Sequence, residues 1–176
     1  VVCFSISDSM SSSGNAMRLA AQELEAEHLV TVIDSQNLST GIGHLVVEAA
    51  ILAQQGKTAE EIREAIEALR PRVRASFVTD TLVYLRRGGR ISAAAQVAGS
   101  LLKIKPILQS DPEGHIIQHS KVRGQLKAME TLAELYKEYA VDGTRTVGIA
   151  HADCPDGALR LQAKLRDAGQ TGEILS

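Results

Sequence analysis

The sequence predicts an α/β fold, and the order of its strand, loop and helix signals supports this prediction. Near the start, apolar strands alternate with polar loops and helices, which is typical of a parallel α/β unit. Past Leu108 the pattern changes to strands joined by turn residues, which indicates hairpins and a mixed or antiparallel sheet. The chain of 176 residues suits one domain or two small lobes.

The first half of the chain repeats the strand–loop–helix order. Thr58 and Glu61 have the spacing of a capping box, so a further helix begins there, and Pro71 ends it. The elements expected in this half are a strand over residues 1–4, a helix over 16–27, a strand over 28–34, a helix over 42–55, the capped helix, and a strand over 73–78.

The second half begins with a short amphipathic turn and a helix of small residues that Ser92 would cap. Asp111-Pro112-Glu113-Gly114 is a turn sequence between two strands, and residues 121–124 form a basic link to the next helix. We expect a strand over residues 104–109 before the turn and a strand over 116–119 after it. These are followed by a helix over 125–139, a strand over 146–150, a helix over 155–168, and a strand over 173–175.

Composition excludes several classes of protein. The formal net charge of −2 offers no basic field for nucleic acid or an anionic membrane surface, and no apolar run is long enough to span a bilayer. Cys3 and Cys154 lack metal or redox spacing, which fits a reducing cytoplasm. The chain opens without Met inside an apolar strand and closes on another strand, so we expect it to be a fragment that lacks both ends.

A serine-rich loop follows the first strand and is the first candidate ligand site. Its hydroxyls are those of Ser7, Ser9, Ser11, Ser12 and Ser13. Ligands of open α/β sheets bind where strands end, and hydroxyls at a helix start suit an oxyanion. The alternative is a flexible loop or a plain serine helix cap.

A Gly-Gly-Arg turn in the middle of the chain is the second candidate. Gly88 and Gly89 allow positive φ and a close approach of the backbone, and Arg90 is a permanent planar donor for carboxylate or phosphate. Arg87 adds a second cation beside it. The alternative is a structural turn whose arginine pairs with an acidic residue.

The sequence contains no catalytic or cofactor-binding signature. A nucleophile elbow, a P-loop and a Rossmann fingerprint are all missing from it. His115 and His119 would lie far apart along a strand, without acidic or cysteine partners, so no metal site is expected. His151 and Asp153 could form a base and a carboxylate, but such a pair is more often a strand end and a helix cap. The residues therefore favour binding of an anion over turnover.

The central stretch resembles the main motif of the DegV family of bacterial fatty-acid-binding proteins. Residues 82–92 read Leu-x-Tyr-Leu-Arg-Arg-Gly-Gly-Arg-Ile-Ser, and residues 99–108 read Gly-Ser-Leu-Leu-Lys-Ile-Lys-Pro-Ile-Leu. The resemblance implies a DegV-like fold of two lobes, a parallel α/β lobe over residues 1–78 and a lobe with a mixed or antiparallel sheet and helices over 79–176. It also implies that the protein binds a long-chain fatty acid, without catalysis of its own, and presents it to a fatty-acid kinase that forms the acyl phosphate.

The resemblance also assigns the site residues. Ser7 to Ser13 match the family's Ser-Ser-Gly-Leu-Ser-Gly-Thr loop, and Ser11 falls on the serine that hydrogen-bonds the fatty-acid carboxylate. Ser7, Ser12 and Arg90 are the further candidates for ligand binding, and Arg87 is a candidate contact for the kinase or its phosphates. No cofactor and no metal are implied.

The chain departs from the family pattern in its serine loop. Ser12 and Ser13 replace Gly-Thr, and Asp8 replaces a serine. A carboxylate at residue 8 would repel an ionised fatty acid or raise the pKa of its head group. Two other functions stay open, an enzyme acting on a small phosphorylated or carboxylated metabolite and a docking module built on Arg86, Arg87 and Arg90.

Overall fold

The structure, a computed structural model, describes residues 1–91, 104–140, 143 and 145–176. Contacts divide the chain into two compact units, unit 1 (Val1–Ala75 with Ser110–His115) and unit 2 (Ser76–Gln109 with Ile116–Ser176). The predicted α/β fold is confirmed, since helices accompany parallel and antiparallel strand pairs. The helix expected from Ser92 lies outside the described residues.

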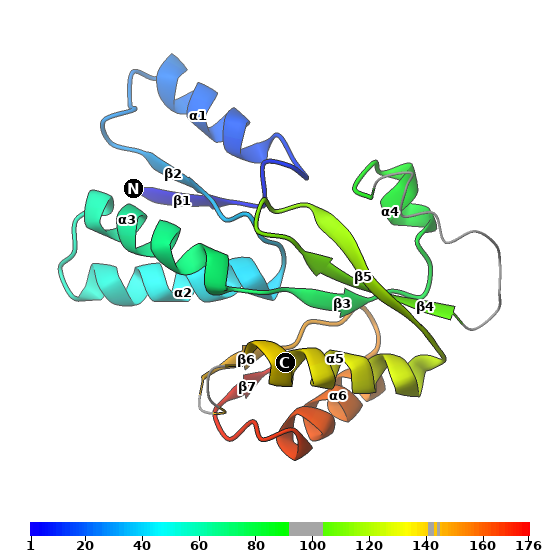
Figure 1. Ribbon diagram of the computed structural model, residues 1–176. Helices are drawn as coiled ribbons and strands as arrows, with labels where there is room; N and C mark the ends of the chain where they lie inside the picture. Colours follow the sequence, from blue (N-terminus) through cyan, green and yellow to red (C-terminus); the bar gives the residue numbers. More distant parts are fainter. Residues whose placement is uncertain (92–103, 141–142, 144) are drawn as a thin grey trace. The chain divides into compact units, whose positions relative to one another are not determined.

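Unit 1 is built on two parallel strands followed by helices (Figure 1). Its regular elements are β1 (Val2–Ser5), α1 (Ser13–Glu23), β2 (Thr31–Asp34), α2 (Thr40–Gln54), α3 (Ala59–Leu69) and the short 3-10 helix η1 (Arg70–Arg72). Ser5 at the end of β1 pairs with Asp34 at the end of β2. The loops that follow the two strands therefore leave the sheet at the same edge.

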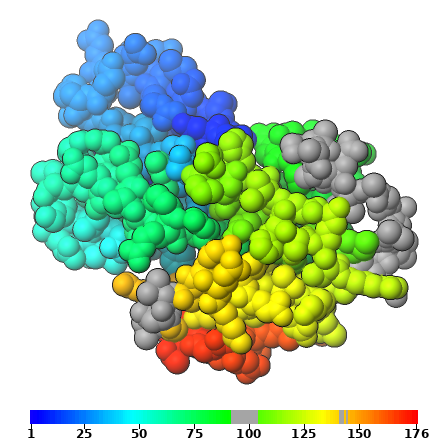
Figure 2. All heavy atoms as spheres, viewed as in Figure 1, coloured from blue at the N-terminus to red at the C-terminus, as the bar shows by residue number. Residues whose placement is uncertain are grey.

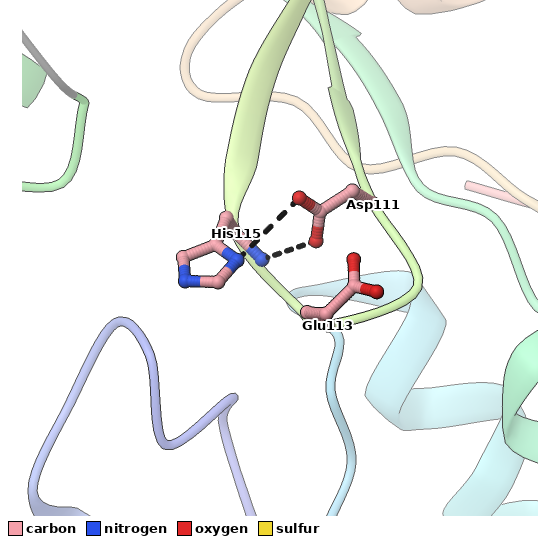
Figure 3. Close-up of side chains that lie close together, drawn as sticks. All are labelled: Asp111, Glu113 and His115. Carbon is pink, nitrogen blue, oxygen red and sulfur yellow. Dashed lines mark hydrogen bonds and ion pairs between the residues drawn. The ribbon is translucent and has the colours of Figure 1, made fainter.

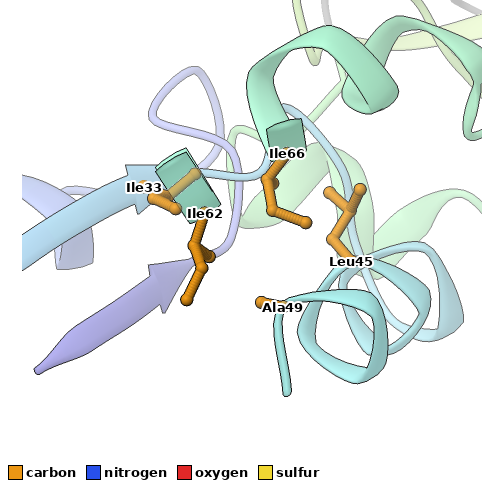
Figure 4. Packing of buried hydrophobic residues seen from close by; sticks show 5 residues of the cluster. All are labelled: Ile33, Leu45, Ala49, Ile62 and Ile66. Atoms are coloured by element: carbon orange, nitrogen blue, oxygen red, sulfur yellow. The ribbon is translucent and has the colours of Figure 1, made fainter. Parts of the chain in front are cut away.

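An aliphatic cluster holds unit 1 together. Ile33 of β2 packs with Leu45 and Ala49 of α2 and with Ile62 and Ile66 of α3, and all five side chains are buried (Figure 4). Burial of an isoleucine or leucine side chain stabilises a fold by about 1.5–3 kcal/mol. The cluster joins both helices to β2, so it fixes where the polar loops at the strand ends begin.

The capping box predicted for α3 is confirmed. The Glu61 N–H donates to Thr58 Oγ1 at 3.2 Å, and the Thr58 N–H donates to Glu61 Oε2 at 2.8 Å. Lys57 Nζ donates to the other carboxylate oxygen at 3.0 Å. The backbone hydrogen bond from Thr58, followed by the bond from Lys57, lowers the pKa of Glu61 from 4.5 to about 2.

Thr58→Ala is expected to lower the free energy of unfolding by about 1 kcal/mol at neutral pH, because it removes the side-chain cap of α3. The Glu61 carboxylate has a lowered pKa, so its part of this stabilisation is present above pH 4.5 and is lost as pH falls toward 2. Urea denaturation at several pH values measures both effects. The exposed Thr146→Ala is the control, and equal losses in the two variants would contradict the prediction.

Unit 2 contains a three-stranded sheet in the order β3-β4-β5 and a separate parallel pair, β6 and β7. Its regular elements are β3 (Ser76–Val78), α4 (Val83–Arg87), β4 (Ile104–Ser110), β5 (Ile116–Arg123), α5 (Gln125–Tyr139), β6 (Val147–Gly148), α6 (Pro155–Asp167) and β7 (Ile174–Leu175). Ser110, the last residue of β4, is grouped with unit 1 by its contacts. The short turn between β4 and β5 makes them an antiparallel hairpin, because parallel neighbours need a long crossover.

The core of unit 2 lies between this sheet and α5. Ile107 of β4 packs against Ala128, Met129, Leu132 and Leu135 of α5, with Val78 and Val122 from the neighbouring strands. Figure 2 shows the hairpin side chains, in yellow-green, directly against those of α5, in yellow. The hairpin therefore has an inward face toward α5 and an outward face.

Several predicted boundaries differ from the structure. α1 begins at Ser13 and ends at Glu23, where residues 16–27 were expected, because Glu25 has a positive φ of 51° that a helix does not tolerate. Residues 121–123 belong to β5, so the predicted basic link is wrong. Residues 110–115, which the sequence placed in the second lobe, group with unit 1. The division after residue 78 stays a prediction.

The described helices include none with the length and apolar character that crossing a bilayer requires.

Candidate functional site

Two polar loops meet at the edge of the sheet where β1 and β2 end. We name them the serine loop (residues 6–12) and the asparagine loop (residues 35–39). The Ser7 N–H donates to the carbonyl of Asn37 at 3.1 Å, so the loops are joined directly. α1 begins where the serine loop ends and α2 where the asparagine loop ends. Helix N-termini carry partial positive charge and free N–H groups, so this edge suits a negatively charged ligand.

Asn37 holds the asparagine loop in place from inside the protein. Its side chain is 1% exposed, and its Nδ2 donates to the carbonyl of Val73 at 3.1 Å. Its Oδ1 accepts the N–H of Leu38 at 3.1 Å, and its backbone N–H donates to Ser35 Oγ at 3.2 Å. The Asn37 amide therefore forms hydrogen bonds with backbone groups that have no backbone partner in an irregular loop.

The tip of the β4–β5 hairpin forms a third part of this edge. Ser9 Oγ donates to the carbonyl of Gly114 at 2.6 Å and lies 2.9 Å from Ser7 Oγ. Gly114 has a φ of +82°, and a Cβ on it would lie 2.1 Å from Ser7 Oγ. The serine loop and the hairpin tip thus touch at a position where only glycine fits.

The predicted ligand residues of the serine loop occupy different environments. Ser7 is fully buried, Ser11 is half-buried, and Ser12 is exposed. Ser11 Oγ accepts the N–H of Ser13 at 3.2 Å, which leaves its own O–H proton to donate. Ser12 is the N-cap residue of α1, but its side chain makes no capping hydrogen bond. Ser11 and Ser12 can therefore both donate to a ligand oxygen at the start of α1.

The charge of Asp8 is compensated within unit 1. Arg18 Nη2 of α1 lies 2.6 Å from Asp8 Oδ2, and the Asp8 N–H donates to Asp34 Oδ1 at 3.2 Å. The repulsion expected from the sequence between Asp8 and an ionised head group did not take the charge of Arg18 into account. The ion pair reduces that repulsion, because the guanidinium offsets the carboxylate charge close to its source.

Arg87 and Arg90 lie in unit 2 at the end of α4. Arg87 is in the last turn of α4. Of the two glycines that allow a positive φ, Gly89 adopts one, +72°, whereas Gly88 has a φ of −75°. Arg90 Nη1 donates to the carbonyl of Gly88 across this turn, and the Arg90 side chain is exposed. The turn therefore places two arginines at the surface of unit 2.

The hairpin tip also gathers three groups that the sequence analysis missed. Asp111, Glu113 and His115 each offer a ligand atom within 4.8 Å of the others (Figure 3). Asp111 Oδ1 accepts the His115 N–H at 2.8 Å, and Asp111 Oδ2 lies 3.4 Å from His115 Nδ1. The statement that His115 lacks acidic neighbours was wrong, since both carboxylates are within four residues of it. Through these contacts Asp111 stabilises the turn that contains Gly114.

His151 is engaged in a local turn. Its Nδ1 accepts the N–H of Cys154 at 3.2 Å at the start of α6, and Asp153 has a φ of 49°. The ring nitrogen that would act as a base is therefore used to cap a turn. This arrangement gives the enzymatic alternative no support.

Sequence reasoning found the serine loop but missed Asn37 and Gly114. The signal for Gly114 was its place in a turn sequence, and the signal for Asn37 was its place in a polar loop after a strand. Neither signal identifies the partner, since Asn37 and Val73 are 36 residues apart and Ser9 and Gly114 are 105 apart.

Comparisons with known proteins identify relatives over the whole chain. The model of the family described as uncharacterised proteins of the DegV family matches residues 1–176. A DegV domain-containing protein from Caldanaerobacter subterraneus subsp. tengcongensis is 36% identical over 147 residues, which cover 83% of this chain and 52% of that protein. The chain spans 51% to 62% of the length of the first curated relatives that it matches.

Solved structures share the fold. A DegV family protein from Ruminococcus gnavus, solved with vaccenic acid, has a TM-score of 0.88 and 28% identity, covering 99% of this chain and 64% of that one. A DegV family protein from Thermus thermophilus, described by its fatty acid binding, has a TM-score of 0.83 and 31% identity, covering 99% of this chain and 62% of that one.

Proposed function

This chain belongs to the DegV family, and we propose that it binds a long-chain fatty acid and presents the carboxylate to a fatty-acid kinase for formation of the acyl phosphate. The head group is held near the serine loop and the Gly-Gly-Arg turn, and the tail is buried. Fatty acids named for the relatives from Ruminococcus gnavus and Thermus thermophilus support this ligand class. The protein is a carrier in this proposal, its partner kinase supplies the catalysis, and its location is the cytoplasm.

The serine loop is the observation that supports the proposal most directly. Ser11 and Ser12 offer hydroxyl donors at the N-terminus of α1, where the partial positive charge of the helix favours a carboxylate. Buried Ser7 joins the serine loop to the asparagine loop and to Ser9, so its proposed role is to shape the head-group site. Arg90 supplies positive charge for the head group, and Arg87 contacts the kinase or its phosphates.

The energetics suit a carrier. A tail of ~15 methylenes at about 0.8 kcal/mol each contributes on the order of 12 kcal/mol before ordering costs. Hydrogen bonds to a charged head group add about 1.5–3 kcal/mol each. Affinity should therefore follow chain length, while the serine loop distinguishes an acid from its ester.

The proposed ligand is tested by denaturing mass spectrometry of organic extracts from the purified protein. A stoichiometric long-chain fatty acid is the expected result, and its length and unsaturation would define the preference. Protein that carries no lipid and takes none up from added free acids would refute the carrier function.

Ser11→Ala is expected to weaken binding of a long-chain fatty acid by about 10- to 150-fold, since it removes one hydrogen bond to a charged group worth about 1.5–3 kcal/mol. The melting temperature should not change, because Ser11 is half-buried and lies in a loop. Calorimetric titration with the acid and with its methyl ester separates the effects. The ester, which has no carboxylate, serves as the control, and an equal loss of affinity for acid and ester would contradict the role of Ser11.

A further inference from the structure

Asp8 places a carboxylate of the protein itself beside the first turn of α1. A Cβ added to Gly14, the second residue of α1, would clash with Asp8 Oδ1, so this oxygen lies against the helix where a side chain is missing. Ser11 Oγ accepts the N–H of Ser13, the first residue of the same helix, at 3.2 Å. The Asp8 carboxylate therefore lies at the helix end to which the ligand carboxylate is assigned.

A carboxylate in this position is suited to occupy the head-group site. The first N–H groups of a helix have no partner within the helix, and the helix N-terminus favours negative charge. A protein carboxylate near a helix start accepts hydrogen bonds from these groups, as the carboxylate of a fatty acid would. The Asp8 side chain is 37% exposed, so packing alone does not fix its rotamer.

Arg18 holds the Asp8 carboxylate by its other oxygen. Arg18 Nη2 donates to Asp8 Oδ2 at 2.6 Å. Arg18 lies on α1 four residues after Gly14, about one helical turn from the helix end. Among the residues that the structure describes, no N–H group of α1 donates to Asp8. The ion pair thus holds the carboxylate against the side of α1 and leaves the N–H groups at the helix end to a ligand.

The other charged groups near Asp8 increase the need for Arg18. The Asp8 N–H donates to Asp34 Oδ1 at 3.2 Å, so a second carboxylate lies beside residue 8. Arg70 Nη1 donates to the backbone carbonyl of Asp34 at 2.7 Å, and Arg18 is the described cation that forms an ion pair with Asp8. Without Arg18, repulsion from Asp34 and attraction to the N-terminus of α1 would both move the Asp8 carboxylate toward the head-group site.

We propose that Arg18 is a positioning residue for fatty-acid binding, because it prevents Asp8 from occupying the head-group site. This inference rests on the proposed function, in which the ligand carboxylate binds at the start of α1. Arg18 acts on the ligand only through Asp8. The pair thereby allows a carboxylate at a position where the DegV pattern has a serine.

The test measures the affinity of the full chain for palmitic acid, by displacement of a fluorescent fatty acid. A salt concentration of about 0.15 M largely screens charges more than about 8 Å apart. Arg18→Gln should weaken binding by about two- to fivefold, the range that loss of an exposed ion pair gives. Arg18→Lys should retain most of the affinity, because an ammonium group can also pair with Asp8.

Asp8→Ser distinguishes a positioning role from a direct one. Alone, it should bind palmitic acid at least as tightly as the parent, since the competing carboxylate is gone. In the Asp8→Ser background, Arg18→Gln should change the affinity by less than about 1.5-fold, because residues that act through each other are not additive. A role of Arg18 in folding alone would lower binding equally in both backgrounds.

Lys57→Gln is the matched control, since it also removes an exposed cation from an ion pair with a carboxylate, that of Glu61. Lys57 follows the end of α2, whereas the head-group site lies where α2 begins. A helix of 15 residues is about 22 Å long, so this change should leave the affinity for palmitic acid unaltered. Its melting temperature should be similar to that of Arg18→Gln, because each variant loses exposed ion pairing.

Three results would overturn the inference and leave the proposed function standing. One is an affinity for palmitic acid that Arg18→Gln does not change. Another is an equal loss from Arg18→Gln in the parent and in Asp8→Ser, and the third is weaker binding by Asp8→Ser than by the parent. Failure of the parent protein to bind palmitic acid or another long-chain fatty acid would overturn the proposed function itself, and the inference with it.

Discussion

Replacing Gly114 with alanine is expected to lower the free energy of unfolding by about 2–5 kcal/mol, from a left-handed backbone and an overpacked contact together. The φ of +82° disfavours any side chain at residue 114. The new Cβ would also lie 2.1 Å from Ser7 Oγ and 2.9 Å from Gln36 Cα, and the second of these is backbone that cannot turn aside. The hairpin tip would have to move away from the serine loop.

Gly56→Ala is the matched control for this prediction. Gly56 follows α2 and has nearly the same φ, +81°, but a Cβ there meets nothing within 4 Å. This variant should lose only about 1–2 kcal/mol, the cost of a left-handed alanine. Urea denaturation of the two variants measures the difference, which is the contribution of the contact between the hairpin tip and the serine loop. Equal stability losses would show that this contact contributes nothing.

Gly114→Ala should also weaken fatty-acid binding where the variant remains folded. The Ser9 bond to the Gly114 carbonyl and the Ser7–Ser9 contact position the serine loop that carries Ser11. Gly56→Ala should bind the acid as the parent does. Unchanged affinity in Gly114→Ala would show that the hairpin tip does not influence fatty-acid binding at the head-group site.

Asn37→Ala is expected to lower the free energy of unfolding by about 2–4 kcal/mol, since each buried group left unpaired costs about 1–3 kcal/mol. The Val73 carbonyl would lose its donor at 3.1 Å and keep only Arg74 Nη1 at 3.5 Å, and the Leu38 N–H would lose its acceptor. The side chain also fills the space beside Gly41, whose Cβ position is 2.0 Å from Asn37 Oδ1. The variant therefore combines unpaired polar groups with a small cavity.

Thermal and urea denaturation of Asn37→Ala test this prediction, with Asn15→Ala as the control. Asn15 is exposed on α1, so its replacement should change stability by less than about 0.5 kcal/mol. Asn37→Asp adds a sharper comparison, because an aspartate can accept from Leu38 but cannot donate to Val73. An Asp variant as stable as the parent would show that the Val73 bond is unimportant.

Local sequence signals were sufficient to predict most of the helices and strands along the chain. The helix expected over residues 125–139 has those bounds in α5, because its apolar spacing and its ends are local properties. The capping box of α3 is also a local property, since Thr58 and Glu61 are three residues apart. The Gly-Gly-Arg motif likewise indicated that the backbone could take a positive φ, and Gly89 has one. Together with the DegV motif, these signals determined the fold class and the ligand class to test.

The arrangement of the head-group loops was decided only by the tertiary structure. Ser7 is buried and Ser12 is exposed, although both are serines of one loop, because the asparagine loop and the hairpin tip cover only the first. The partners of Ser9 and Asn37 come from distant parts of the chain, and Arg18 compensates the charge of Asp8 only once α1 has formed. Periodicity and propensity report what a segment forms by itself. Which polar atoms meet depends on how the packed elements place them, so those contacts follow from the core and not from the local pattern.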